Sequence, residues 1–138
     1  MLSHSEKETL KSGRSLAKKL KPGDIICLFG DLGAGKTVFT KGIAEGLGIK
    51  RGRIISPTFV IIREHSSGRL PLYHFDLYRL NDPEDILRLG YEEYLYNQGV
   101  SVIEWADRLK YLLPEKYLKV ELTVKSPTKR SIKISKIQ

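Results

Sequence analysis

The chain has 138 residues, of which 41% are hydrophobic and 29% charged, so it can bury the core of one domain and disorder is not expected. Its one cysteine, Cys27, excludes an internal disulfide framework, and its longest apolar run, residues 25–29, is far too short to cross a bilayer. The net charge is +8, with an acidic excess in residues 74–109 and a basic excess in residues 110–138.

The first part of the chain predicts a helix, a strand and a second helix, in that order. Ser5, followed three residues later by Glu8, forms a capping box, which indicates a helix that begins there and ends at the turn of residues 21–24. Residues 25–29 are a short apolar run between turn residues and predict a buried strand. After a glycine-rich stretch, the helical spacing of apolar residues resumes over residues 38–47.

The rest of the chain predicts mainly strands. A turn at residues 65–68 separates two apolar runs, which predicts a hairpin. A proline in the first turn predicts a helix start at residues 81–84, and apolar residues continue from there to residue 96. The expected strands cover residues 58–63, 70–77, 99–104, 117–124 and 131–137, the last two with the alternation of half-exposed strands.

Residues 30–37 match the phosphate-loop pattern G-x-x-x-x-G-K-[ST] without a mismatch. The glycines let the backbone curl so that several N–H groups point at phosphate oxygens, and the start of the following helix adds its positive end. Lys36 can reach the β- and γ-phosphates, and the Thr37 hydroxyl suits Mg²⁺, which takes few protein oxygens. The strand before the motif and the helix after it form the setting that this loop requires. The alternative is a glycine-rich turn that contains an unrelated lysine.

The nucleotide base is predicted from a missing pattern. A guanine-specific loop protein usually carries an Asn/Thr-Lys-x-Asp signature, and residues 40–43 and 128–131 both lack the aspartate. We therefore expect adenine, with ATP and ADP as the ligands.

Two carboxylates are candidates for catalysis or metal binding beside the phosphate loop. Besides the loop hydroxyl, Mg²⁺ needs an acidic ligand, which normally lies at the end of an apolar strand. Glu104 closes such a strand, and the alternative is a surface glutamate. Asp76 shares one face of its strand with His74 and Tyr78, and such a face suits a metal or water site. An exposed Asp–Arg pair explains the same spacing equally well. His74 is excluded as a zinc ligand, because none of the three histidines has a partner at ligand spacing.

The spacing leaves the roles of two further residues open. Thr58 lies in the first loop beyond the phosphate-loop helix, where nucleotide switches sense the γ-phosphate, and the alternative is a simple Ser-Pro turn. Trp105 directly follows Glu104. It is either a core or edge aromatic or a packing element beside the phosphates that moves on hydrolysis.

Four signatures occur together and in order, and in this combination the chain resembles the TsaE family, also called YjeE, over essentially its whole length. They are the phosphate loop of residues 30–37, Ser-Pro-Thr-Phe at 56–59, His-Phe-Asp-Leu-Tyr-Arg-Leu at 74–80 and Val-Ile-Glu-Trp at 102–105. The members of this family are small bacterial ATPases of tRNA threonylcarbamoyladenosine synthesis.

The resemblance implies an α/β fold: a single P-loop NTPase-like domain over residues 1–138, with a central, largely parallel sheet flanked by helices and antiparallel strands at an edge. It also implies that the protein binds ATP and Mg²⁺, hydrolyses ATP slowly and acts with TsaB and TsaD, the latter being the threonylcarbamoyl transferase. The protein is expected to contact tRNA through that complex, in which the modified base is the adenosine next to the anticodon. Because the N-terminal residues lack the apolar core of a signal peptide, we expect a cytoplasmic protein with no membrane contact.

The resemblance also assigns site residues. Lys36, Asp76 and Glu104 are expected to be catalytic, with Asp76 organising the metal or the attacking water. Thr37, Glu104 and Asp76 are expected to hold Mg²⁺. The residues expected to contact the nucleotide are Leu32, Gly33, Ala34, Gly35, Lys36, Thr37, Glu6, Thr58, Trp105 and Arg130.

Two other functions remain open at this point. A small P-loop kinase needs an acceptor pocket and an arginine-rich lid, and no Arg-x-x-x-Arg pattern follows the loop. A nucleotide-gated binding module would share the loop without hydrolysing ATP. The basic residues 110–138 are expected to meet acidic protein or tRNA surface within the complex rather than to bind free tRNA tightly.

Overall fold

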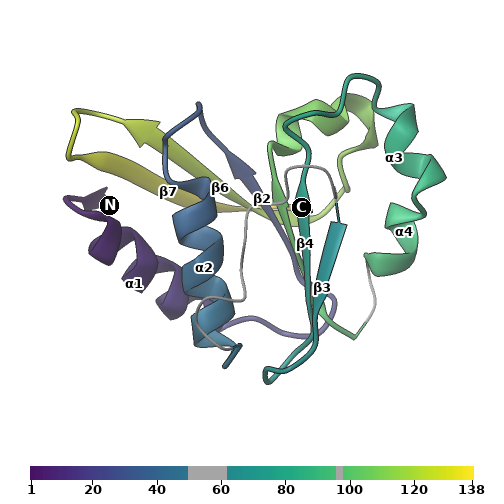
Figure 1. Ribbon diagram of the computed structural model, residues 1–138, viewed down its shortest axis with the longest axis horizontal. Helices are drawn as coiled ribbons and strands as arrows, with labels where there is room; N and C mark the ends of the chain where they lie inside the picture. Colours follow the sequence, from purple (N-terminus) through teal and green to yellow (C-terminus); the bar gives the residue numbers. More distant parts are fainter. Residues whose placement is uncertain (50–61, 96–97) are drawn as a thin grey trace.

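A mixed β-sheet runs through the molecule, with helices packed on both of its faces (Figure 1). The computed structural model describes residues 1–49, 62–95 and 98–138. Within these residues seven strands form the sheet, in the order β1-β7-β6-β2-β5-β4-β3. Their bounds are Leu2–Ser3 (β1), Ile25–Phe29 (β2), Ile62–His65 (β3), Leu72–Asp76 (β4), Val100–Glu104 (β5), Tyr117–Val124 (β6) and Arg130–Ile137 (β7).

The centre of the sheet is parallel and its edges are antiparallel. β2 lies between β5 and β6 and is parallel to both, and β4 is parallel to β5. At one edge β7 is antiparallel to β6 and β1, and at the other edge β3 is antiparallel to β4. The predicted fold class is therefore confirmed.

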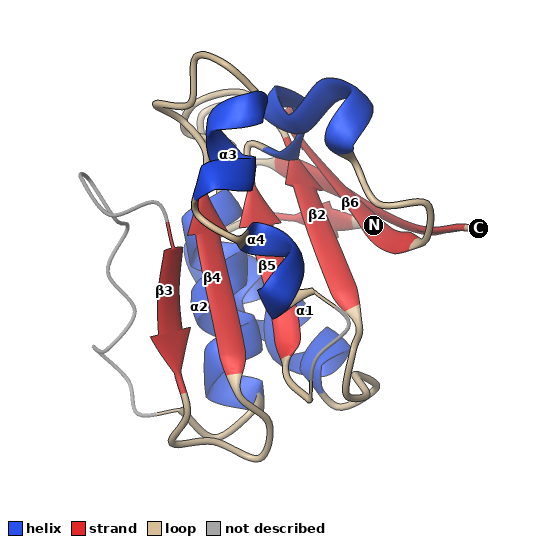
Figure 2. Ribbon diagram, turned by 90° about the vertical axis from the view of Figure 1, so that its right-hand side faces the viewer, coloured by secondary structure: helices blue, strands red, loops and turns tan. Residues whose placement is uncertain are grey.

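The helices divide between the two faces of the sheet. α1 (Glu6–Ala17) and α2 (Lys36–Gly46) lie side by side on one face, whereas α3 (Glu84–Arg88) and α4 (Tyr91–Tyr94) lie on the other, as Figure 2 shows. A 3₁₀ helix, η1 (Ala106–Leu112), packs into the same core as α3 and α4. None of the helices in the described segments has the length and apolar character needed to traverse a bilayer.

Each central strand contributes alternate side chains to two separate hydrophobic cores. Ile26 and Leu28 of β2 belong to the core under α1 and α2, and Ile25 and Cys27 belong to the core under α3 and η1. This alternation follows from the period of two along a strand. A residue's position along a strand therefore decides which layer of helices it meets.

Local sequence signals located most of these elements. β2 and β6 have the predicted bounds, β3 and β4 form the predicted hairpin, and the Ser5 hydroxyl accepts a hydrogen bond from the Glu8 backbone N–H at 3.2 Å, as expected at a helix start. Three features were not anticipated. Gly90, with φ of 68°, separates α3 from α4 where continuing apolar residues were expected, and η1 follows β5. The short strand β1 also had no predicted counterpart.

α1 and α2 approach so closely that only glycine fits at the crossing. A Cβ atom added to Gly42 of α2 would lie 2.2 Å from the Leu10 carbonyl oxygen of α1, and one added to Gly13 of α1 would lie 2.4 Å from the Phe39 carbonyl oxygen. Both distances are far inside van der Waals contact, so a side chain at either position would push the helices apart. This packing fixes α2, whose N-terminus begins at the phosphate loop.

We expect Gly42→Ala to lower the free energy of unfolding by about 1–3 kcal/mol, because the added methyl group overpacks the helix crossing. Urea-induced unfolding of the two proteins measures the difference. Lys41→Ala, at the neighbouring exposed position of α2, is the matched control and should change stability by less than about 0.5 kcal/mol. Equal stability of the Gly42→Ala variant and the parent would contradict the close approach of the two helices.

Candidate phosphate-binding site

The phosphate loop connects the carboxyl end of β2 to the start of α2, as the sequence predicts. Gly35 is the N-cap of α2 and has φ of 102°, a left-handed conformation in which a side chain would be strained. Gly30 lies against β6, where an added Cβ would be 2.5 Å from the Leu122 carbonyl oxygen. The loop therefore needs glycine at both positions in order to turn directly from the sheet into the helix.

Lys36 is the first residue of α2, and its side chain folds back over the loop. It is 4% exposed, and its Nζ donates hydrogen bonds to the carbonyl oxygens of Gly30 at 2.5 Å and Asp31 at 2.8 Å. Burial lowers the pKa of the Lys36 ammonium group, and nearby carboxylates, that of Glu104 first, act in the opposite direction. The loop thus holds a buried cation whose partners are two backbone carbonyls, partners that an anion with free oxygens can replace.

Thr37 and Glu104 come together although they are 67 residues apart. The Thr37 Oγ1 hydroxyl donates to Glu104 Oε1 at 2.8 Å, and Thr40 Oγ1 lies 3.4 Å from Glu104 Oε2. His74 Nε2 makes a short contact with the same Oε2. Glu104 is the last residue of β5, which lies beside β2, so the parallel pairing brings its carboxylate to the phosphate loop.

The pair of Thr37 and Glu104 fits Mg²⁺, because this ion binds a hydroxyl and one or two carboxylates and leaves its other positions to water and phosphate. Among the described residues, no group of three or more His, Cys, Asp or Glu side chains could hold a metal ion. The two candidate donors at the end of β5, the Thr37 hydroxyl and the Glu104 carboxylate, are both oxygen ligands.

Asp76 ends β4 in the position directly opposite Glu104 of β5. The Asp76 side chain is buried, and its Oδ1 accepts a hydrogen bond from the Tyr78 backbone N–H at 3.0 Å. Because β2, β5 and β4 are parallel neighbours, the loop, Glu104 and Asp76 all lie at the carboxyl ends of these central strands. The structure thus brings the two predicted carboxylates together, and their roles stay predictions.

Trp105 covers the Lys36 side chain. It follows β5 in a left-handed conformation, with φ of 58° and ψ of 42°, and Lys36 Nζ lies 3.8 Å from the centre of its ring. The Tyr78 ring lies 5.0 Å from the Trp105 ring, and the Arg108 guanidinium lies 5.6 Å from it. Non-glycine residues adopt this backbone conformation rarely, and such strain gathers at functional sites. Thr58, the predicted switch residue, lies outside the described residues.

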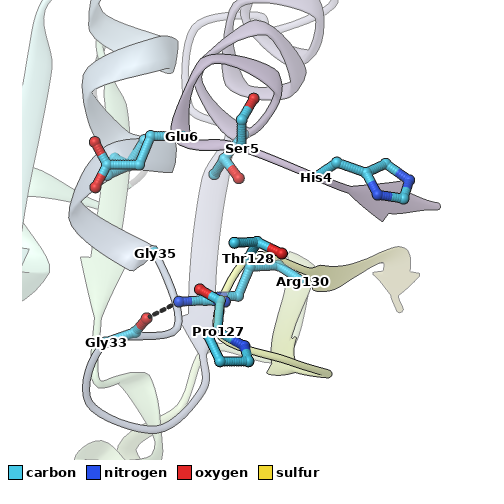
Figure 3. Close-up of a pocket in the computed structure, with 10 residues that line it drawn as sticks. His4, Ser5, Glu6, Gly33, Gly35, Pro127, Thr128 and Arg130 are labelled. Carbon is cyan, nitrogen blue, oxygen red and sulfur yellow. Dashed lines mark hydrogen bonds between the residues drawn. The ribbon is translucent and has the colours of Figure 1, made fainter.

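A pocket of about 320 Å³ opens beside the loop, between the start of α1 and the turn that joins β6 to β7 (Figure 3). Arg130 reaches across it and donates from Nη2 to the Gly33 carbonyl oxygen at 3.0 Å. Glu6 and Arg130, which are far apart in the sequence, both line this pocket, whereas Asp76 and Glu104 do not. The lining residues are His4, Ser5, Glu6, Thr9, Gly33, Gly35, Val38, Pro127, Thr128 and Arg130.

Several residues that the structure brings to these sites have no role predicted from the sequence. Thr40 and Arg108 do not belong to any recognised motif. His4, Thr9 and Thr128 line one pocket because the fold brings the N-terminal segment beside the turn between β6 and β7. His74 had a signal, since strand alternation placed it with Asp76, but its contact with Glu104 crosses from β4 to β5. Contacts of this kind need the strand order, which the sequence pattern does not contain.

An α/β domain in which a phosphate loop follows a central parallel strand belongs to the class of P-loop proteins. Comparison with known proteins narrows this class. The family model described as "Threonylcarbamoyl adenosine biosynthesis protein TsaE" matches residues 3–132. The chain belongs to the TsaE family, which confirms the resemblance noted in the sequence.

Relatives and a solved structure support this assignment over almost the full chain. The "tRNA threonylcarbamoyladenosine biosynthesis protein TsaE" of Bacillus subtilis is 47% identical over 125 residues, which cover 91% of this chain and 77% of that protein. The protein of the same name from Treponema pallidum is 41% identical over 134 residues, covering 97% and 98%. The crystal structure of Bacillus subtilis YdiB superposes with a TM-score of 0.83 at 40% identity, covering 99% of this chain and 83% of that one.

The contact between Lys36 and Trp105 can be tested by fluorescence, because Trp105 is the one tryptophan of the chain. An ammonium group beside an indole ring quenches its emission by proton transfer in the excited state. We therefore expect Lys36→Met to raise the emission of the folded protein and to leave that of the urea-unfolded chain unchanged. Lys41→Met, at an exposed position of α2, should alter neither. Identical spectra for folded Lys36→Met and the parent would contradict the contact.

Proposed function

We propose that the protein is the Mg²⁺-dependent ATPase subunit of the machinery that makes threonylcarbamoyladenosine in tRNA. Membership of the TsaE family supports the pathway. The observation that carries the ATPase is the hydrogen bond between Thr37 of the phosphate loop and Glu104 at the end of β5. It joins the two groups that a phosphate loop uses for the metal of its nucleotide.

Nucleotide binding would begin with an exchange of partners at Lys36. Its Nζ now donates to two loop carbonyls, and phosphate oxygens are stronger acceptors for a buried ammonium group. The backbone N–H groups of residues 32–37 and the N-terminus of α2 add a positive potential at the same place. Trp105 covers the lysine from the other side and limits the access of water to it.

Thr37 and Glu104 would hold Mg²⁺, with Asp76 beside them. When bound, this ion neutralises charge that develops on the phosphate oxygens. Glu104 keeps the Thr37 hydroxyl hydrogen pointed at its own carboxylate, which leaves the oxygen lone pairs of Thr37 available as a ligand. Asp76 would orient a water molecule for attack on the terminal phosphate, and its buried position opposite Glu104 supports this role.

The adenine and ribose would occupy the pocket beside the loop. Arg130 and Glu6 line it, and Arg130 is joined to the loop through the Gly33 carbonyl. The pocket and the loop share Gly33 and Gly35, so a nucleotide that has its phosphates on the loop can reach the pocket. This arrangement supports nucleoside triphosphate over free phosphate as the ligand.

We further propose that the chain acts with TsaB and TsaD in the cytoplasm and meets tRNA through that complex. Hydrolysis would be slow in the isolated protein and would support turnover of the complex rather than form the adduct itself. The segment of residues 110–138 has a basic excess. It would therefore be attracted to an acidic partner surface and would steer the encounter between the proteins.

A reconstitution tests this function and separates it from the two alternatives. The protein is incubated with ATP, Mg²⁺, TsaB, TsaD, threonylcarbamoyl donor and unmodified tRNA, and both ADP release and modified adenosine are followed. We expect ADP and phosphate as the products and sustained modification only when this chain is present. A phosphorylated acceptor would favour the kinase, and modification sustained by ATP binding without hydrolysis would favour the gated module.

We expect Lys36→Ala to weaken ATP binding about 10- to 100-fold, because a charge-assisted hydrogen bond to phosphate is lost. Isothermal calorimetry measures the affinity, with Lys41→Ala as a control for the loss of one positive charge on the same helix. Unchanged ATP affinity in Lys36→Ala would refute the phosphate-loop assignment.

Glu104→Gln and Asp76→Asn should both bind ATP and should hydrolyse it at least about 100-fold more slowly, because each removes a negative charge from the metal and water side of the site. Single-turnover hydrolysis and calorimetry on the same samples separate the two effects. Glu121→Gln, outside the site on β6, is the matched control. Parental hydrolysis rates in both variants would show that these carboxylates are not catalytic.

A further inference from the structure

His74 is a buried polar side chain to which the function described above gives no role. It lies in β4 and is 0% exposed. Its Nε2 contacts Glu104 Oε2, and its Nδ1 is buried without a hydrogen-bond partner in the part of the chain that the structure describes. Because a carboxylate can only accept, Nε2 carries the hydrogen of this bond.

Among the described residues, Glu104 is the one hydrogen-bond partner of the His74 ring. Leu72 of β4 and Val102 of β5, on the same face of the sheet, belong to the core under α1 and α2. Asp76 is the next position of β4 on this face, and Arg63 of β3 lies opposite His74. Leaving one ring nitrogen unpaired in such a place costs free energy. An apolar side chain would avoid that cost, so the bond to Glu104 is the feature that accounts for a histidine here.

The Glu104 carboxylate depends on His74 for one of its two oxygens. Oε1 accepts from Thr37 at 2.8 Å. Oε2 accepts from His74 and otherwise meets only Thr40 Oγ1, at 3.4 Å, among the described residues. The Thr40 hydroxyl already donates to the Lys36 carbonyl oxygen at 2.9 Å. Without His74, the carboxylate would therefore be free to rotate about its terminal bond and would lose its fixed direction toward Thr37.

We propose that His74 is a positioning residue, which locks the Glu104 carboxylate so that Thr37 and Glu104 present a preformed Mg²⁺ site. This inference rests on the proposed function, because it concerns the same metal. Groups that orient a metal ligand typically contribute 10- to 100-fold to metal affinity. The nucleotide itself is held by the loop and by the pocket, which His74 does not line.

The test compares side chains that differ in whether they reach Glu104. His74→Gln keeps an amide donor at about the reach of Nε2, His74→Asn carries the same amide one methylene shorter, and His74→Leu has no donor. Tyr73→Phe is the control, because Tyr73 is the neighbouring buried residue of β4 and faces the other core. For each protein we would measure ADP affinity by calorimetry with Mg²⁺ and with EDTA, the Mg²⁺ concentration for half-maximal ATPase activity, and the thermal unfolding midpoint.

We expect the asparagine and leucine variants to need about 10- to 100-fold more Mg²⁺ and to bind ADP in EDTA as the parent does. The glutamine variant and Tyr73→Phe should stay within about threefold of the parent in both measurements. A parental Mg²⁺ requirement in folded His74→Asn or His74→Leu would overturn the inference. A loss of ADP affinity in EDTA as large as the loss in Mg²⁺ would also overturn it. Failure of both variants to fold, with Tyr73→Phe folded, would also overturn it, because His74 would then be structural. A parent protein with no Mg²⁺-dependent nucleotide binding would instead refute the proposed function.

Discussion

The candidate site depends on the parallel pairing of β2, β5 and β4. Because parallel strands end at the same edge of a sheet, this pairing brings the phosphate loop after β2, Glu104 at the end of β5 and Asp76 at the end of β4 to one place. The chain order of the three strands is β2, β4, β5, but β5 lies between the other two in the sheet. That crossover sets Glu104 directly beside the loop, within 2.8 Å of Thr37.

Strand alternation then decides what faces the loop. The side of β4 and β5 that carries His74, Asp76 and Glu104 is the side on which α2 packs, and further along the strands it carries Leu72, Val100 and Val102. Charged and polar groups thus lie at the end of an apolar row, where burial strengthens their interactions with one another. The close approach of α1 and α2 at Gly13 and Gly42 holds the first residues of α2, and with them Lys36 and Thr37, against this row.

The sequence predicted the parts of the molecule that are encoded by neighbouring residues. The apolar run of β2, the glycine-rich loop and the carboxylate at the end of β5 each have a local pattern, and so does the cap at Ser5. Three features have no such pattern. One is the left-handed conformation of Trp105, whose ring lies over Lys36. The others are the pocket lined by Glu6 and Arg130 and the contact between His74 and Glu104. Each contact joins segments that are brought together only by the strand order and the packing of the helices. The resemblance to the family supplied Glu6 and Arg130 as candidates outside its four motifs, and in the structure both residues line one pocket.

A crystal structure of the protein with Mg²⁺ and a non-hydrolysable ATP analogue would test the proposed site directly. We expect Lys36 Nζ to leave the carbonyl oxygens of Gly30 and Asp31 for phosphate oxygens, and the ion to lie beside Thr37 and Glu104. We also expect the base to enter the pocket lined by Glu6 and Arg130. A nucleotide bound elsewhere, or Lys36 still on the loop carbonyls with the phosphates in place, would contradict the proposed site.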